Sequence, residues 1–383
     1  MVDTVVITLE WRKDFELMEG CYKQFATDVT NFFRPPFVQF GTKKAFLVER
    51  NPTAKEKADG NYMPRLTLIK AVRRGGVPIT LNIEFSAQKV VHNDNFNEIT
   101  QSDFDYLCVQ LQRKLHNIGV VVTGPNTLKD AMVSTIHYSK NITLTDYSTA
   151  HAIITDLEKC NYTTRKKSDG QKYINNGEAM HFYSSKWGLC IYDKLKEHTK
   201  SKVTEKGLLE KDYYCQLSLF DEKPLASPFE MVRVEARYIG RPQIKKSFKD
   251  AGLQTDSLTF SDLFNETTAK KMLRYEITKL RETYPVISLT DKTAPALLTE
   301  LSIQNPRTQI GTIMEAVAYK TLLETTGSRD VRNIGNFTSQ QWYNLNKKIN
   351  SLNFARRKIA SFDIIESQLQ KFEPVKLQRY LDK

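Results

Sequence analysis

A run of nine residues, Glu230–Tyr238 (EMVRVEARY), limits the possible folds of this chain more than any other segment. From Val232 onward, apolar and charged residues alternate along it without a break. Because successive side chains of a β-strand point to opposite faces, one face is apolar and the other carries Arg233, Glu235 and Arg237. The run predicts a half-buried strand. Its charged face is either a solvated surface or a place where the carboxylate binds a divalent cation and the arginines hold a phosphate.

Strand and helix signals alternate over the first 250 residues. The other predicted strands are Thr4–Glu10, Val133–Ile142 and two hairpins, Arg65–Val72 with Ile79–Phe85 around Gly75-Gly76, and Met180–Tyr183 with Leu189–Asp193. The predicted helices are a segment that Ser102 caps and Gly119 ends, and Asp146–Leu157. Beyond Gly240, helical periodicity dominates over Ser261–Arg281, Ala294–Ile303, Gly311–Glu324 and Ser339–Ala360. The sequence predicts an α+β fold, with an antiparallel sheet core, helices packed on one face and an α-helical C-terminal region.

Three ranges follow from this organisation: an N-terminal α+β unit over 1–125, a second α+β unit over 126–250, and a helical, basic region over 251–383. A chain of 383 residues is long enough for two or three domains. Lys and Arg number 56 against 44 Asp and Glu, a net charge of +12. Residues 241–383 hold 23 basic and 15 acidic residues, which is +8 of that total. The excess indicates a polyanionic partner held mainly by the helical region.

Several classes of protein are excluded. No stretch approaches the ~20 apolar residues that span a bilayer, and the basic residues do not lie opposite a broad apolar helix face, which disfavours a membrane-surface protein. The N-terminal segment has no apolar core typical of a signal peptide. The five cysteines form no CxxC pair, so we expect a reducing cytoplasm. The phosphate-loop, GxGxxG, HExxH and GxSxG motifs are absent.

Within the helical region, Gly327–Gly335 and Thr338–Lys348 predict a short helix, a turn with glycine and a second helix. This order is typical of helix-turn-helix units that bind DNA. The side chains in reach of base edges are Gln340, Gln341 and Asn344, and those in reach of phosphates are Lys347, Lys348, Arg356 and Arg357. The alternative is an ordinary helical bundle with a solvated basic face.

The segment Leu189–Lys194 (LCIYDK) places Tyr192 and Lys194 on one face of a strand and Asp193 on the other. A tyrosine hydroxyl, with an unperturbed pKa of about 10, can attack a phosphodiester when nearby positive charge favours the phenolate. Packing is the simpler role for such a pair. His137 and His181 also lie in predicted strands; they are metal ligands if they converge with Glu235, and otherwise core or edge histidines.

Seven short motifs follow one another between about residues 80 and 265. They are FSAQK at 85–89, NDNFNE at 93–98, IHYSKNI at 136–142, HFYSSK at 181–186, IYDK at 191–194, VRVEAR at 232–237 and LTFSDLF at 258–264. In this order they resemble the replication initiators of phages and plasmids of the gene II/X type. The YDK and RVEAR segments are also similar to rolling-circle plasmid initiators. The chain has no His-hydrophobic-His run, the usual metal motif of HUH nickases.

The resemblance implies a replication initiator whose tyrosine nicks one strand at an origin, leaving a 5′-phosphotyrosyl link and a 3′-OH that primes rolling-circle replication. The residues that it assigns to catalysis are Tyr192, Lys194 and Arg237. The candidate metal ligands are Glu235, His137, His181 and Asp193, and Mg²⁺ or Mn²⁺ is the expected ion. Arg233 and Lys186 are expected to contact DNA. Tyr183, on the neighbouring strand of the same hairpin, is the rival nucleophile.

The implied organisation is a nicking core over 126–250 and a DNA-binding region over 251–383. The expected partner is origin DNA, single-stranded or as a supercoiled duplex, in the cytoplasm of a bacterial host, with a host polymerase and helicase and with a homodimer left open. No membrane partner is expected. The alternative function is a non-catalytic DNA-binding protein or a replication repressor derived from an initiator.

Overall fold

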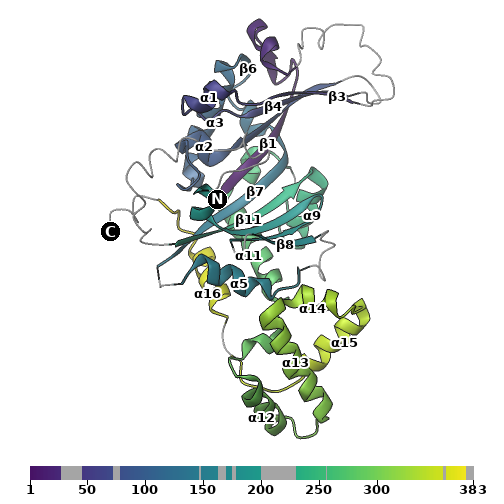
Figure 1. Ribbon diagram of the computed structural model, residues 1–383. Coiled ribbons are helices and arrows are strands. Elements are labelled where there is room, and N and C mark those ends of the chain that lie inside the picture. The colour runs from purple at the N-terminus through teal and green to yellow at the C-terminus, as the bar shows by residue number, and fades with distance from the viewer. Residues whose placement is uncertain are drawn as a thin grey trace.

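The computed structural model describes residues 1–26, 45–71, 78–145, 148–162, 170–174, 178–199, 230–255, 257–356 and 359–376. A mixed α+β architecture is built on an antiparallel sheet that has nine strands in this part of the chain (Figure 1). Their spatial order is β3 (Ala45–Arg50), β4 (Arg65–Ala71), β5 (Ile79–Ser86), β1 (Val2–Glu10), β7 (Met132–Leu144), β11 (Glu230–Ile239), β10 (Trp187–Asp193), β9 (Ala179–Tyr183) and β8 (Gly170–Ile174). A small second sheet pairs β2 (Phe15–Leu17) with β6 (Val120–Val122).

The alternating run predicted as a strand is β11, and it lies near the middle of the sheet. It pairs with β7 on one side and with β10 on the other, both antiparallel. Both predicted hairpins are also confirmed as antiparallel pairs, β4 with β5 and β9 with β10. The proposed turn at Gly75-Gly76 lies outside the described residues. Because β11 has a partner on each side, its side chains are held in rows with those of its neighbours.

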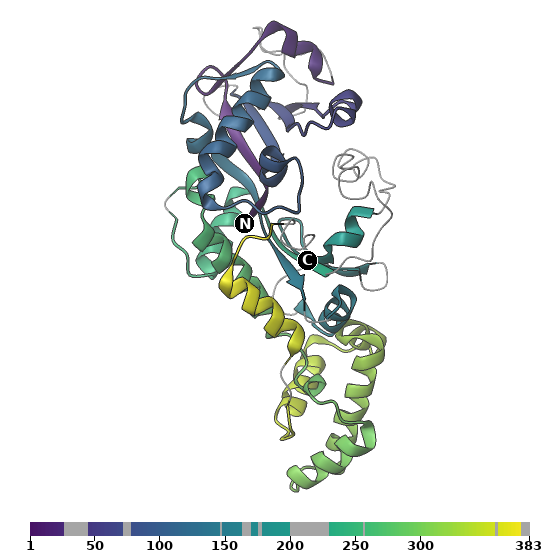
Figure 2. The ribbon, with the colours of Figure 1, turned by 90° about the vertical axis from the view of Figure 1, so that its left-hand side faces the viewer.

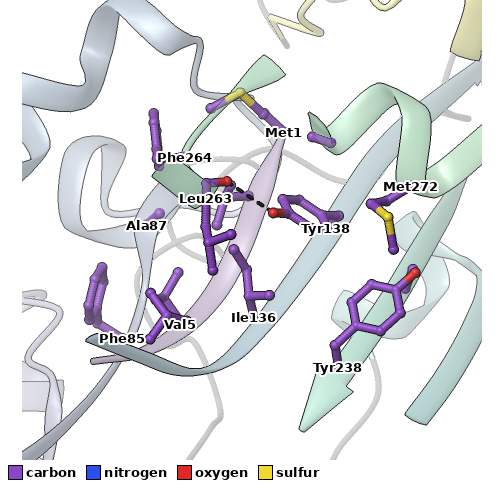
Figure 3. Packing of buried hydrophobic residues seen from close by; sticks show 14 of the residues in the cluster. Met1, Val5, Phe85, Ala87, Ile136, Tyr138, Tyr238, Leu263, Phe264 and Met272 are labelled. Carbon is purple, nitrogen blue, oxygen red and sulfur yellow. Dashed lines mark hydrogen bonds between the residues drawn. The ribbon is translucent and has the colours of Figure 1, made fainter. Parts of the chain in front are cut away.

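Helices cover one face of this sheet, as the sequence predicted. The helices of this unit are α1 (Ala54–Ala58), α2 (Ala87–His92), α3 (Phe104–Asn117), α4 (Thr127–Asp130), α5 (Ala150–Glu158), α6 (Lys194–Thr199), α9 (Arg241–Asp250), α10 (Phe260–Leu263), α11 (Glu266–Arg281) and α16 (Ala360–Lys371), with short 3-10 turns at Glu19–Gln24 and Gln101–Asp103. Tyr138 of β7 donates a hydrogen bond to the Leu263 carbonyl across the core (3.0 Å; Figure 3). Phe260 packs edge-on against Phe85 and Phe104. Burial of these apolar side chains is the main stabilisation of the unit.

A second hydrophobic core lies in the helical lobe at the other end of the molecule (Figures 1 and 2). Its helices are α12 (Ala294–Gln304), α13 (Ile310–Thr326), α14 (Ser328–Ile334) and α15 (Ser339–Asn350), together with a 3-10 turn at Val286–Leu289. Its buried residues run from Ile287 to Phe354, whereas Ile359, Phe362, Ile365 and Leu369 belong to the first core. The chain therefore returns to the sheet unit through α16, and the predicted range 251–383 is divided between both cores.

Two predicted helical ranges are interrupted. Ser261–Arg281 is split into α10 and α11 because Asn265 caps a new helix, its side chain accepting a hydrogen bond from the Thr268 amide. Ser339–Ala360 contains all of α15 but only the first residue of α16. No helix in the described part of the chain has the length and apolar character needed to cross a lipid bilayer.

The buried carboxylate of Glu276 links the sheet to helix α11 through hydrogen bonds. Glu276 of α11 is fully buried and accepts hydrogen bonds from the Tyr162 hydroxyl (2.7 Å), the Trp187 indole (3.0 Å) and the Tyr238 hydroxyl (3.0 Å). Burial and then the charge of Glu276 raise the pKa of both tyrosines, so both keep their protons and donate. Since Trp187 begins β10 and Tyr238 lies in β11, this carboxylate holds both strands against α11.

We expect Glu276→Ala to destabilise the protein by about 3 kcal/mol or more, because three buried donors lose their acceptor at once. Urea unfolding followed by near-ultraviolet circular dichroism measures the effect, since Trp187 reports on this region. Glu282→Ala is the matched control: its carboxylate, near the end of the same helix, pairs with partly exposed Lys279 at 3.2 Å, so a change below ~0.5 kcal/mol is expected. Equal losses in the two variants would contradict the role given to Glu276.

Candidate functional site

The face of the sheet opposite the core carries polar side chains in register across neighbouring strands. Arg233 lies opposite Tyr192 and Asn141, and Arg237 opposite Gly188 and His137. Between them, the central row joins His181, Cys190, Glu235 and Ser139 across β9, β10, β11 and β7. Directly paired residues of antiparallel strands point to the same side. Residues far apart in sequence therefore share one polar face.

Glu235 is the centre of this face. Its Oε1 atom lies 2.7 Å from Arg237 Nε and 3.1 Å from His137 Nδ1, and its side chain is buried. Burial alone would raise the pKa of Glu235. Arg237, His137 and Arg233 outweigh burial and hold that pKa well below its usual value. Glu235 is therefore ionised at neutral pH, with positive charge on several sides.

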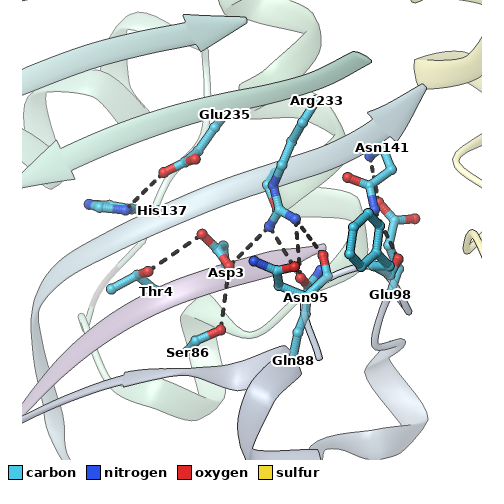
Figure 4. A network of polar contacts seen from close by, with 12 residues as sticks. Asp3, Thr4, Ser86, Gln88, Asn95, Glu98, His137, Asn141, Arg233 and Glu235 are labelled. Atoms are coloured by element: carbon cyan, nitrogen blue, oxygen red, sulfur yellow. Dashed lines mark hydrogen bonds and ion pairs between the residues drawn. The ribbon is translucent and has the colours of Figure 1, made fainter. Parts of the chain in front are cut away.

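Asp3 of β1 completes a group that could hold a metal ion, and the sequence did not predict it. Among the residues that the structure describes, Asp3, His137 and Glu235 each offer a ligand atom, and these atoms lie within 4.8 Å of one another (Figure 4). Two carboxylates and one imidazole form a donor set that suits a hard divalent cation such as Mg²⁺ or Mn²⁺. The residues present thus fit the ion expected from the sequence.

A local irregularity brings Asp3 to this face. Val2 and Val5 are both fully buried, although regular alternation would place residues three apart on opposite faces. The pairing of β1 with β7 shifts register between these two residues. The broken alternation in VDTV is the one signal in the sequence that could have indicated that Asp3 leaves the core face.

Tyr192 and Lys194 lie beside this cluster. The Tyr192 hydroxyl donates to Glu235 Oε2 over 3.4 Å, and its side chain is 8% exposed. The buried Lys194 ammonium lies 5.7 Å from the centre of the Tyr192 ring and 5.6 Å from that of Phe96. The cation therefore lies over the ring faces, where it is attracted to the π-electrons.

The other predicted residues of the sheet unit lie elsewhere. His181 shares the central row but is two strands from Glu235, about 10 Å away by strand spacing, and it is not part of the three-residue group. Asp193 lies opposite Val232, and its carboxylate accepts hydrogen bonds from the Leu195 and Lys196 amides at the start of α6. Burial raises the pKa of Asp193, an effect that the Lys196 amide opposes.

The two remaining residues, Tyr183 and Lys186, lie at one end of the β9–β10 hairpin. Tyr183 pairs with Gly188 in the row of Arg237, which puts it on the polar face. Lys186 is exposed in the turn between the strands, and its carbonyl accepts a hydrogen bond from the Ile239 amide. Tyr183 is thus on the same face as Tyr192, but two rows away from the row that Tyr192 shares with Arg233.

In the helical lobe, α14 and α15 have the predicted order of short helix, turn and second helix. Thr338 caps α15, with Gln341 bonded back to the Thr338 amide (2.9 Å). Gln340 donates to Asn344 (3.0 Å) on the exposed side of the helix, where Tyr343 is 60% exposed. Lys347 is exposed, whereas Lys348 pairs with Glu315 at 2.6 Å. Arg356 stacks on Phe354 at 5.1 Å, and Arg357 lies outside the described residues.

The fold and the site define an α+β protein with a charged, metal-capable cluster beside a tyrosine on one face of an antiparallel sheet. A family model described as the N-terminal part of a phage replication-associated protein, the gene II protein, matches residues 68–285. The chain belongs to this family of phage rolling-circle replication initiators. The match includes His137, Tyr192, Glu235 and Arg237, and it ends where the second core begins. No curated protein and no solved structure matches the chain.

The lowered pKa of Glu235 predicts a pH-dependent contribution to stability. A carboxylate with a depressed pKa in the folded state stabilises the fold above its unfolded value, near 4.5, and this stabilisation is lost as the pH falls through the folded value. We therefore expect Glu235→Gln to be less stable than the wild type by about 2 kcal/mol at pH 7, and the difference to shrink below pH 4.5. Thermal unfolding between pH 7 and pH 3 measures it.

Glu10→Gln is the control for this experiment, because that side chain is well exposed and pairs only loosely with Lys13, at 3.7 Å. Its stability should stay within ~0.5 kcal/mol of the wild type at each pH. A Glu235→Gln difference that is constant from pH 7 to pH 3 would contradict the account of this carboxylate.

Proposed function

We propose that this initiator nicks one DNA strand at its origin by attack of Tyr192 on a phosphodiester. The tyrosine oxygen forms a bond to phosphorus and the bond from phosphorus to the 3′ oxygen breaks. The products are a 5′-phosphotyrosyl link and a free 3′-OH that primes rolling-circle replication. One observation carries the assignment: in a chain of an initiator family, the Tyr192 hydroxyl lies 3.4 Å from a carboxylate of the metal-capable cluster.

Glu235 orients the nucleophile in this proposal and does not act as its base. A carboxylate whose pKa is held well below its usual value accepts a proton poorly at neutral pH. Its hydrogen bond nevertheless points the Tyr192 oxygen toward the cluster. The hydroxyl proton then passes to solvent as the bond to phosphorus forms, and the leaving 3′ oxygen takes a proton from solvent.

Arg237 and Lys194 are proposed to hold the charge of the reacting phosphate. The side chain of Arg237 is 38% exposed while its Nε atom bonds Glu235, so the rest of the guanidinium can face a bound strand. Lys194 adds a buried positive charge beside the tyrosine ring. Asp3, His137 and Glu235 would hold Mg²⁺ or Mn²⁺, which would supply Lewis-acid stabilisation of charge on the phosphoryl oxygens.

One observation favours the alternative, a non-catalytic DNA-binding protein or repressor. Tyr192 is only 8% exposed, so DNA must reach a side chain that is nearly covered in the free protein. A denaturing gel with labelled single-stranded origin DNA separates the two functions. A metal-dependent covalent species supports the nickase, and salt-sensitive binding without that species supports the binder.

For the nickase, we expect Tyr192→Phe to abolish the covalent adduct and to lower nicking of a supercoiled origin plasmid at least ~1000-fold, because the attacking oxygen is removed. Wild-type protein and variant are incubated with Mn²⁺ and resolved on the denaturing gel. Tyr183→Phe is the matched control, since it removes a hydroxyl from the same hairpin and the same face. If Tyr192→Phe still forms the adduct, Tyr192 is not the nucleophile. If only Tyr183→Phe loses the adduct, the nucleophile is Tyr183.

We further propose that the exposed side of α15 binds the origin duplex. Gln340 and Asn344 would contact base edges from this side, with Lys347 contacting phosphate and Tyr343 adding an exposed aromatic ring. The proposal is supported by the order of α14, turn and α15, by the burial of Trp342 and Leu345 on the inner side, and by the net +8 of residues 241–383.

Two adjacent lysines test this surface. Lys347→Ala should weaken binding to every duplex alike and reduce the slope of log affinity against log salt by about 1, because one phosphate contact is lost. Lys348→Ala should change the slope less, since Glu315 already neutralises that lysine. Fluorescence anisotropy between about 50 and 300 mM NaCl gives both values. Unchanged slopes in both variants would remove α15 from the interface.

A further inference from the structure

Arg233 is among the most completely enclosed side chains in the described part of the chain, with 1% of it exposed. Its guanidinium donates to the Asn95 carbonyl (2.8 Å), to Ser139 Oγ (2.8 Å) and to Gln88 Oε1 (3.2 and 3.3 Å), and it pairs with Asp3 Oδ1 at 3.0 Å (Figure 4). These partners come from α2, the segment after it, β7 and β1. Arg233 thus joins four parts of the polypeptide at one point.

Arg233 and Arg237 lie on the same face of β11, but their surroundings differ. Arg237 is 38% exposed and bonds Glu235 through Nε, whereas both terminal nitrogens of Arg233 are occupied by protein groups. To reach a phosphate, Arg233 would have to give up its buried contacts, and loss of a buried charged hydrogen bond is strongly unfavourable. Of the two, Arg237 is placed to meet DNA.

We propose that Arg233 is a positioning residue that acts through Asp3, fixing this carboxylate as a ligand of the divalent cation. The proposal rests on the metal cluster of the proposed function and assigns Arg233 a role other than contact with DNA. The planar guanidinium binds Asp3 Oδ1 while Gln88, Ser139 and Asn95 fix the plane of the guanidinium itself. Groups that hold ligands in this way typically change metal affinity 10- to 100-fold when they are altered.

The position of Asp3 explains why its carboxylate needs a second residue to orient it. Asp3 lies one residue into β1, at the register shift between Val2 and Val5, so regular pairing with β7 does not fix its backbone. Its other side-chain contacts, with Thr4 and Ser86, are long at 3.5 Å. The ion pair with Arg233 is therefore the strongest side-chain contact that orients this carboxylate.

A double-mutant cycle on Mn²⁺ affinity tests the proposal, with free Mn²⁺ measured by electron paramagnetic resonance on the full chain without DNA. We expect Asp3→Asn and Arg233→Lys each to raise the Kd about 10-fold. Combined, they should raise it little further than Asp3→Asn alone, because Asp3 is the one member of the three-residue group with which Arg233 forms an ion pair. Thermal melting of each variant verifies that it is folded at the assay temperature.

Arg237→Lys is the matched control, because Arg237 contacts Glu235 and not Asp3. Its effect on the Kd should be independent of Asp3→Asn, so that the two fold-changes multiply in the double variant. Gln88→Leu is a milder second variant: it removes the Oε1 acceptor, and Gln88 Nε2 has no hydrogen-bond partner among the described residues. We expect Gln88→Leu to raise the Kd about 3-fold in the wild-type protein and to leave it unchanged when Asp3→Asn is already present.

The proposal would be overturned if the factors by which Arg233→Lys and Asp3→Asn raise the Kd multiplied in the double variant. It would also be overturned if neither Arg233→Lys nor Gln88→Leu changed the Kd. A wild type that binds no Mn²⁺ would overturn it as well. The Tyr192→Phe experiment separates this failure from failure of the nickase. If the protein forms the covalent adduct but does not bind Mn²⁺, only the role of Arg233 is wrong. If the double-mutant cycle gives the expected result but no adduct forms, only the nicking activity is wrong.

Discussion

The burial of charged groups on β11 is the constraint on which the rest of the sheet unit depends. Arg233 and Glu235 are almost completely removed from water, in an interior where an unpaired charge is strongly unfavourable. Each is therefore surrounded by partners, and these partners come from β1, β7, β11 itself and the segment from α2 to Asn95. Since removal of any one partner leaves a buried charge incompletely paired, the polar face specifies how these segments come together as strictly as the apolar core does.

The sheet itself gives this polar face its rigidity. Where β7 runs past the start of β1, its backbone amides are satisfied by other groups: Ser139 donates to the Met1 carbonyl, Asn141 to Glu98 and Thr143 to Gln368 of α16. On the opposite face, Glu276 holds β10 and β11 against α11. The strands that carry His137, Tyr192 and Glu235 are thus fixed on both faces, and β7 is fixed also along the part that β1 does not cover. Rigid elements of this kind hold reacting groups more accurately than loops can.

Sequence patterns predicted most of the fold because most of its signals are local. The alternation of β11, both hairpins and the periodicity of the C-terminal helices are each readable within about ten residues. The site depends instead on register, which joins strands far apart in the chain: nothing local distinguishes His137, which meets Glu235, from His181, which lies two strands away. Asp3 was missed for a related reason: the break in alternation at VDTV signals that the strand is irregular there, but not that Asp3 meets His137 and Glu235 of strands far along the chain.

The arrangement of the two cores bears on how DNA binding and chemistry are connected. The buried residues of the helical lobe run from Ile287 to Phe354, and α16 then packs on α11 in the sheet unit. After α16, the chain bonds to the segment that flanks Arg233: Glu98 accepts from the Val375 amide and pairs with Lys140, which itself donates to the Glu373 carbonyl. The lobe is therefore attached through two connections, and the second of them ends beside the network of the polar face. An attachment at two points restricts the orientations of a lobe more than a single linker does. In the proposed function, a lobe so restricted would present bound DNA to the face of Tyr192 in few directions, which would favour cleavage at one position.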